Sequence, residues 1–133
     1  MDSKRNISIV GGAGHVGFPL GLILSSKGFK VSLIDKHLKN MKKINNGEPP
    51  FLEEKSVNLL KTMIKKKRIL TTEHLSEVKN SKYIIICIGT PVNKRLNPSS
   101  EGINEIIPEI SNGLFFLTSF SSLFIKWLPN YLR

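Results

Sequence analysis

The sequence is poor in cysteine, and this shortage excludes a fold held together by intramolecular disulfides. Its 133 residues include one cysteine, Cys87, which alone cannot form an intramolecular disulfide or hold a metal ion. The chain therefore shows no sign of an oxidising compartment, and we predict no metal site. Because Cys87 lies in the apolar run 83–88, we interpret it as a small buried side chain.

Acidic residues are also scarce. Ten Asp and Glu oppose 20 Lys and Arg, so the formal net charge is +10. Such an excess can attract nucleic acid, an anionic membrane surface or a phosphorylated ligand. The densest basic run, residues 65–68, closes a predicted helix, where cations suit the negative end of the helix dipole. Since no nucleic-acid motif accompanies the charge, we predict a solvated basic surface, without a nucleic-acid or membrane partner.

Long uncharged apolar runs are missing as well. The uncharged run at residues 110–125 has 16 positions and several Ser, Thr and Asn, which is short and polar for a membrane-spanning helix. The stretch 7–26 follows Lys4 and Arg5 as in a signal peptide, but it contains five glycines and no clean cleavage site. We therefore expect a cytoplasmic protein.

The length suits one ordinary domain, which we place at residues 1–113. Residues 114–133 form a divergent tail rich in Phe and Ser, in which 114–118 is a candidate remnant of a fifth strand. The tail resembles the product of a truncation, a shifted reading frame or a broken gene, although a genuine short protein stays an alternative.

Predicted strands and helices alternate along the chain. Apolar and β-branched runs predict strands at 7–10, 30–34, 69–71 and 83–88. Apolar spacing predicts helices at 14–27, 37–46, 53–67 and 103–110, with a weak turn at 75–80. We expect the first helix to bury a stripe of four residues, Val16, Leu20, Ile23 and Leu24. The alternation predicts the α/β class, as a truncated Rossmann-type doubly wound parallel sheet.

A glycine-rich turn joins the first predicted strand to the first predicted helix. Gly12, Gly14 and Gly17 have the GxGxxG spacing of dinucleotide-binding turns. We expect Gly12 to allow the tight turn, Gly14 to let a diphosphate approach the backbone, and Gly17 to let the helix pack closely on the sheet. The N–H groups that open the helix would hold the diphosphate.

Asp35 ends the second predicted strand, 18 residues beyond Gly17. A carboxylate at this place accepts hydrogen bonds from the adenosine ribose and repels the extra phosphate of NADP, so we predict NAD. Lys36 and Lys39 keep NADP open as an alternative, since a nearby cation accommodates that phosphate. A purely structural alternative is that the glycines only permit close packing and Asp35 only caps the next helix. We expect the side chain of His15 to be exposed on the turn.

Further motifs resemble one known family. The segments 44–47 (INNG), 50–53 (PFLE) and 81–91 (SKYIIICIGTP) follow the glycine turn in this order. Together they resemble the N-terminal NAD-binding domain of the UDP-glucose/GDP-mannose dehydrogenase family over about residues 6–110, most like its UDP-N-acetylmannosamine branch. That family oxidises the C6 alcohol of a nucleotide sugar to a carboxylate, with two NAD and a thioester on a catalytic cysteine.

The resemblance implies roles for particular residues. Gly14, His15 and Val16 would lie along the diphosphate of NAD, and Asp35 would bind the adenosine ribose. Thr90 and Pro91, which follow the last strand, would lie beside the cofactor. The family's nucleophilic cysteine, catalytic lysine and sugar-nucleotide domain lie beyond this length. Cys87, in a buried strand without a basic neighbour, is not that nucleophile.

We therefore predict no catalytic residue in the chain and no turnover by the chain alone. It would bind a UDP-sugar only if a second half were supplied, and full-length family members would be homo-oligomers. Two other functions stay open. One is a stand-alone dinucleotide-binding regulator, and the other is a binder of polyanions.

Overall fold

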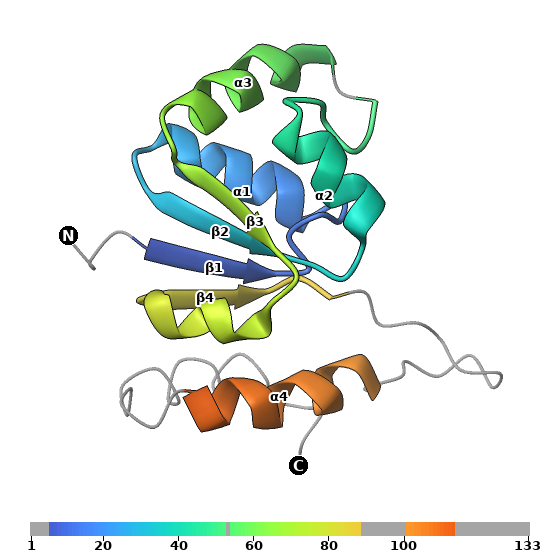
Figure 1. The fold of residues 1–133 in the computed structure, drawn as a ribbon, viewed down its shortest axis with the longest axis vertical. Helices are drawn as coiled ribbons and strands as arrows, with labels where there is room; N and C mark the ends of the chain where they lie inside the picture. Colours follow the sequence, from blue (N-terminus) through green and yellow to red (C-terminus); the bar gives the residue numbers. More distant parts are fainter. Residues whose placement is uncertain (1–5, 53, 89–100, 114–133) are drawn as a thin grey trace, which may run out of the picture.

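The computed structural model describes residues 6–52, 54–88 and 101–113 (Figure 1). The strands are β1 (Asn6–Val10), β2 (Lys30–Ile34), β3 (Ile69–Thr72) and β4 (Tyr83–Ile86). The α-helices are α1 (Gly17–Ser26), α2 (Leu38–Asn45), α3 (Val57–Lys65) and α4 (Glu101–Gly113). Two short 3₁₀ helices are η2 (Glu54–Ser56) and η3 (Leu75–Asn80). The predicted alternation of strands and helices is confirmed.

The four strands form one parallel sheet in the order β3-β2-β1-β4. The chain moves outward from β1 to β3 and then returns to the other side of β1. Figure 1 shows α1, α2 and α3 on one side of this sheet and α4 on the other. Strand order therefore reverses between β1 and β4, which is where open α/β sheets form their ligand crevice. The predicted Rossmann-type parallel sheet is confirmed.

Alternation along the strands divides the core between the two faces of the sheet. Ile7, Ile9 and Leu33 face α1, α2 and α3 in the larger buried cluster. Val10 and Ile34 face the opposite way, in a smaller cluster with residues of η3, β4 and α4. This second face also buries Ser8, whose hydroxyl lies 2.6 Å from that of Ser81. The hydroxyl pair supplies a hydrogen-bond partner that buried polar groups need.

The helix α1 packs through a face that we did not predict. Its buried residues are Gly17, Phe18, Gly21, Leu22 and Ser25. Val16 and Ile23, which we expected in the core, are 68% and 56% exposed. Leu20 and Leu24 are half-buried and pack at the margin of the larger cluster. The predicted stripe was therefore wrong at Val16 and Ile23.

Glycine is the reason for this orientation of α1. A Cβ on Gly21 would lie 2.6 Å from Cδ2 of Leu33 and 3.3 Å from Cδ1 of Ile9. A helix without side chains at this position approaches the sheet closely enough to bury both neighbouring large residues, Phe18 and Leu22. Apolar spacing alone does not reveal this, because glycine counts as neither polar nor large.

Two further expectations need correction. The strand predicted at 83–88 ends at Ile86, and Tyr83 is 43% exposed instead of buried on both faces. β4 pairs only with β1 within the described residues, so its far side lacks a neighbouring strand there. The first helix begins at Gly17 instead of residue 14, because residues 11–16 form the turn. The candidate fifth strand and the tail lie outside the described residues.

Within the described part of the chain, no helix is both long and apolar enough to cross a membrane. Nor do residues 6–52, 54–88 and 101–113 contain a group of three or more His, Cys, Asp or Glu side chains placed to hold a metal ion.

Candidate functional site

The glycine turn leaves β1 through Gly11, which has a φ of +82°. Side chains are strained in that conformation, so Gly11 makes the turn that we assigned to Gly12. The N–H groups of both glycines donate to the carbonyl of Ile34, at 2.8 and 3.1 Å. The start of the turn is thereby attached to the end of β2.

The glycines of the fingerprint differ in their surroundings. A Cβ on Gly12 would lie 2.8 Å from Cα of Leu33, and one on Gly17 would lie 2.2 Å from the carbonyl oxygen of Gly11. Both approaches are to backbone atoms, which cannot move aside cheaply. A Cβ on Gly14 would have only the Gly11 oxygen within 4 Å, at 3.3 Å, among the described residues. Gly12 and Gly17 are thus required by the fold, whereas Gly14 faces open space that a ligand can enter.

The first turn of α1 presents unpaired backbone donors. The N–H groups of His15, Val16 and Gly17 have no hydrogen-bond partner among the described residues. The preceding Gly14 N–H donates to the Gly11 carbonyl, and the following Phe18 N–H donates to the Gly14 carbonyl. Three successive free N–H groups at the positive end of a helix dipole favour an anion such as a phosphate.

Asp35 connects this turn to the segment that follows β2. Its Oδ2 accepts a hydrogen bond from the N–H of Ala13 at 3.0 Å, and its Oδ1 accepts one from the N–H of His37 at 2.9 Å. The side chain of Asn40 in α2 donates to the Ala13 carbonyl at 3.2 Å. Asp35 therefore has a structural role beside the start of α2. Each of its oxygens retains a second lone pair for a ligand.

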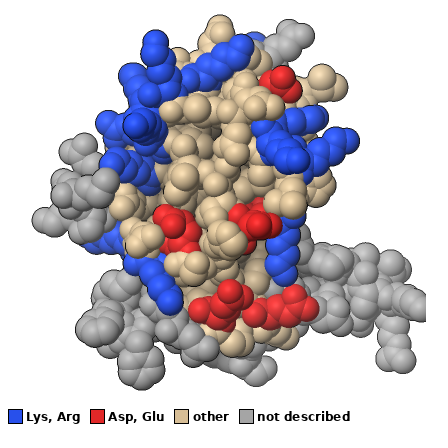
Figure 2. Space-filling view, in the orientation of Figure 1, with Lys and Arg blue, Asp and Glu red and all other residues tan. Residues whose placement is uncertain are grey.

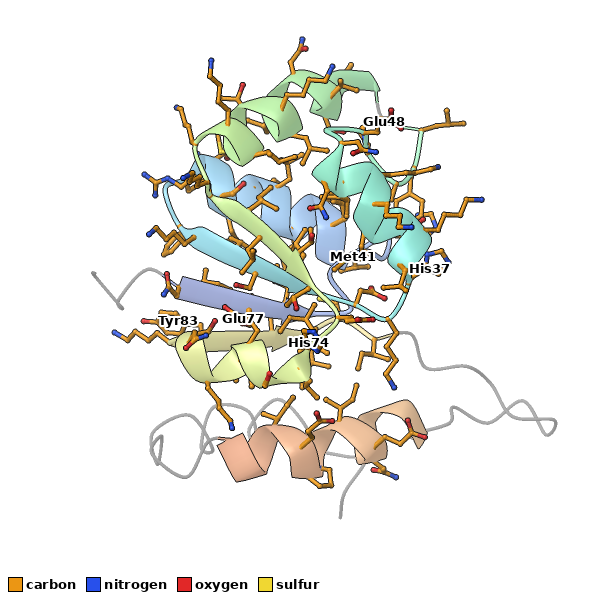
Figure 3. The ribbon with its side chains drawn as sticks, viewed as in Figure 1. His37, Met41, Glu48, His74, Glu77 and Tyr83 are labelled. Atoms are coloured by element: carbon orange, nitrogen blue, oxygen red, sulfur yellow. The ribbon has the colours of Figure 1, made fainter. Side chains whose placement is uncertain are left out.

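A cleft of about 750 Å³ opens at the carboxyl ends of β1, β2 and β4. Its floor contains Gly11, Gly14 and Asp35, so the glycine turn and the carboxylate meet there as predicted. The structure adds three acidic residues and His74 to the cleft lining. Of these, Figure 3 labels His74, which lies beside the strand ends. The acidic residues on the cleft wall are Glu73 from the segment after β3 and, from α4, Glu105 and Glu109.

Some predicted site residues do not line this cleft. Gly12, His15, Val16 and Gly17 are absent from its walls, although the last three provide the free N–H groups beside Gly14. Thr90 and Pro91 lie outside the described residues, so their predicted place beside the cofactor stays a prediction.

Cys87 lies where β4 leaves the sheet. Its N–H donates to the carbonyl of Val10 at 2.7 Å, and its side chain lies at the cleft wall, half-buried rather than fully buried. Burial raises the pKa of the Cys87 thiol above its ordinary value. The thiol is therefore protonated near neutral pH, which is the reverse of what a nucleophilic cysteine needs.

Phe51 is a neighbour of the turn that sequence reasoning missed. Its ring stacks on the ring of His15, with 3.6 Å between centroids and 19° between planes. His15 is exposed, as predicted. The sequence singled out Phe51 only as part of the family motif 50–53 (PFLE), and nothing local places that residue over a turn 36 positions earlier.

Comparisons with known proteins agree with this geometry. The family model described as "UDP-glucose/GDP-mannose dehydrogenase family, NAD binding domain" matches residues 5–115. An uncharacterized protein of Methanocaldococcus jannaschii is 38% identical over 89 residues, which are 67% of this chain and 10% of that protein. UDP-N-acetyl-D-mannosamine dehydrogenase of Pyrococcus horikoshii is 29% identical over 82 residues, 62% of this chain and 20% of its own length. The chain thus spans a fifth or less of these two relatives.

Solved structures share the fold. GDP-mannose dehydrogenase of Pseudomonas aeruginosa, in a ternary complex, superposes with a TM-score of 0.72 and 27% identity over 80% of this chain and 24% of that one. UDP-glucose dehydrogenase of Pyrobaculum islandicum gives a TM-score of 0.75 over 82% of this chain and 25% of that one, at 19% identity, which supports the fold alone. With the family model covering most of its length, this chain belongs to the UDP-glucose/GDP-mannose dehydrogenase family and carries the NAD binding domain of that family.

Proposed function

We propose that NAD binds with its diphosphate on the free N–H groups of His15, Val16 and Gly17 and its adenosine ribose on Asp35. The observation that carries this proposal is that the unpaired donors directly follow Gly14 on the turn that Asp35 holds at Ala13, and that Gly14 and Asp35 line one cleft. Gly14 leaves room for the diphosphate to approach the backbone. Thr90 and Pro91 are proposed neighbours of the cofactor, on the family resemblance.

The same arrangement favours NAD over NADP. Asp35 would accept hydrogen bonds from the ribose hydroxyls, and a phosphate esterified there would meet its negative charge. Glu73, Glu105 and Glu109 add negative charge to the same cleft. Lys36 is the only Lys or Arg among the described lining residues, so the described part of the lining has a negative balance.

We further propose that the chain provides the NAD-binding part of a nucleotide-sugar dehydrogenase. Relatives are named for UDP-N-acetyl-D-mannosamine, UDP-glucose and GDP-mannose. When bound, NAD would accept a hydride from the sugar alcohol. This chain's residues would hold and orient the cofactor, but Cys87 is unsuited to the covalent step. Residues 1–133 alone should therefore bind NAD without oxidising a UDP-sugar, whereas sugar binding and homo-oligomers would need the second half.

Calorimetric titration of the 133-residue chain with NAD tests the binding proposal. Wild-type protein should bind NAD, and NAD at 100 times its dissociation constant should add about 2.7 kcal/mol to the free energy of unfolding. Asp35→Ala should weaken binding roughly tenfold to a hundredfold, because it removes a hydrogen bond to a charged group. Glu48→Ala is the matched control, since Glu48 is exposed and lies beyond α2, away from the cleft (Figure 3).

Folded wild-type protein that binds neither NAD nor NADH would overturn the proposal. Equal NAD affinity in Asp35→Ala and wild type would refute the role of the carboxylate. NADH formed from NAD and a UDP-sugar by the purified chain would contradict the predicted lack of turnover.

A further inference from the structure

The two ends of the glycine turn are held in different ways. At Ala13 the backbone is tied on both sides, because its N–H donates to Asp35 and its carbonyl accepts from Asn40. Two residues later, at His15, the N–H has no partner among the described residues and the side chain is exposed. The ring contact with Phe51 is the interaction that the structure gives to the His15 side chain.

Phe51 reaches this position through a well-defined segment. After α2 the N–H of Gly47 donates to the Ile44 carbonyl and the N–H of Glu48 to the Lys43 carbonyl, both at 2.9 Å. With Gly47 at a φ of +77°, this is the Schellman arrangement that ends a helix and turns the chain back.

The segment is also packed on α3. A Cβ on Gly47 would lie 2.8 Å from Cγ of Lys61, so the absence of a side chain lets the two segments touch. Pro50 is buried and Phe51 is half-buried, whereas the next residue, Leu52, is fully exposed. The ring of Phe51 therefore comes from a part of the chain that packs on the rest of the domain, whereas the side chain of Leu52 makes no such packing contact with the described residues.

We propose that Phe51 is a positioning residue of the NAD site, acting through His15 on the diphosphate-binding N–H groups. This inference rests on the proposed function. Three N–H groups bind one diphosphate well only if they are held in a common direction before the ligand arrives. The stack restrains the residue that lies between Gly14, which has no side chain to restrain it, and Val16, which is exposed. Losing the ring contact leaves His15, the first residue of the donor set, free to rotate.

The first experiment compares NAD affinity in three variants. Phe51→Leu should raise the dissociation constant for NAD roughly threefold to tenfold, which is the range for losing one stacked aromatic pair. Phe51→Tyr keeps the ring and should bind as wild type does. Leu52→Ala, the matched control in the same segment, should also bind as wild type does.

A spectroscopic readout separates positioning from general loss of structure. In wild type the ring protons of His15 should be shifted upfield in the NMR spectrum by the ring current of Phe51. The shift should disappear in Phe51→Leu, persist in Phe51→Tyr and be unaffected in Leu52→Ala. An unshifted His15 in wild type would overturn the proposal, because the stack would then be absent in solution.

A double-mutant cycle keeps the test decisive if Phe51→Leu folds poorly. His15→Ala removes the exposed partner of the stack and should weaken NAD binding by a similar factor. Adding Phe51→Leu to His15→Ala should then cause little further loss, because the two rings act as a pair. Fully additive losses, or wild-type affinity in both single variants, would overturn the role of Phe51 while leaving NAD binding itself established. Absence of NAD binding by wild type would instead overturn the proposed function, and this inference with it.

Discussion

The two edges of the parallel sheet differ in the charged side chains that border them. The carboxyl edge, where the strands end, holds the cleft and four acidic residues: Asp35, Glu73, Glu105 and Glu109. The amino edge, where the strands begin, is bordered by six basic residues: Lys27, Lys30, Lys65, Lys66, Lys67 and Arg68. In Figure 2 Lys and Arg line the left margin, where the strands begin, and also lie on the right, where the strands end, whereas most Asp and Glu lie in the lower half of this face.

The direction of the helices explains the basic edge. Because the strands are parallel, α1 and α3 both end at the amino edge, where their negative dipole ends gather. Arg68, which follows α3, donates from its guanidinium to the carbonyl of Gly28, which follows α1. The basic residues there suit exposed carbonyl groups and need no external polyanion.

The carboxyl edge shows how little the net charge says about the ligand. A protein of charge +10 places its proposed dinucleotide site in a cleft whose described lining residues have a negative balance. The diphosphate is matched to backbone N–H groups instead of lysines, and the carboxylate is matched to a ribose. Charge summed over the whole chain therefore predicts solubility and general attraction, not the chemistry of the site.

The largest effect on NAD binding and stability should come from adding a methyl group to the glycine turn at the carboxyl edge. Gly17→Ala places a Cβ 2.2 Å from the Gly11 carbonyl oxygen, so the turn and α1 must separate. We expect NAD binding to be lost and the free energy of unfolding to fall by about 2–3 kcal/mol. Denaturant unfolding and calorimetry measure both effects.

Gly28→Ala is the matched control at the amino edge. Gly28 has a φ of +99°, and a Cβ there would meet only Nη1 of Arg68 among the described residues, at an ordinary contact distance of 3.9 Å, so strain alone should cost about 1 kcal/mol of stability. The folded variant should keep wild-type affinity for NAD. If both glycine variants lost NAD binding equally, the two edges would not differ as described.

An intermediate effect should appear in the chemistry of Cys87. Burial raises the pKa of this thiol, so alkylation near pH 7 should be slower than that of an exposed thiol. As long as the pH stays below that pKa, raising the pH by one unit should increase the labelling rate roughly tenfold, because the thiolate is the reacting form. Saturating NAD should slow the reaction several-fold, because Cys87 lines the cleft. Alkylation followed by mass spectrometry tests this, and identical rates with and without NAD would place the ligand elsewhere.

The smallest effect should follow neutralisation of the amino edge. Replacing Lys65, Lys66 and Lys67 together by Gln should change the dissociation constant for NAD less than about twofold, since exposed charges far from the site are screened by salt. The comparison variant is Lys36→Gln, which removes a positive charge inside the cleft instead of at the amino edge. Titrations at low and physiological salt measure both. A large loss from the triple variant would indicate that the amino edge takes part in binding.

Local signals were enough for the first βαβ unit. The β-branched run, the glycine spacing and Asp35 lie within 30 residues, and each acts through its own backbone or its near neighbours. The positive φ of Gly28, which follows the first helix, is likewise a property of the local backbone. The second helix also begins and ends within a residue or two of its predicted bounds.

The predictions that failed depend on partners distant in the sequence. Val16 and Ile23 have the spacing of a core face, but Gly21 meeting Leu33 decides which face of α1 is buried. β4 lacks a second described neighbour, so its buried residues are fewer than its composition suggests. In each case a close contact across the sheet outweighs a local pattern.

By itself the sequence determined the order of the elements, the glycine turn and the carboxylate that follows the second strand, because backbone conformation and hydrophobic periodicity are properties of neighbouring residues. Only the tertiary structure decided that Phe51 stacks on His15 and that Glu105 and Glu109 of α4 wall the cleft. These groups meet because parallel strands bring their ends together whatever their distance along the chain. No local pattern contains that information.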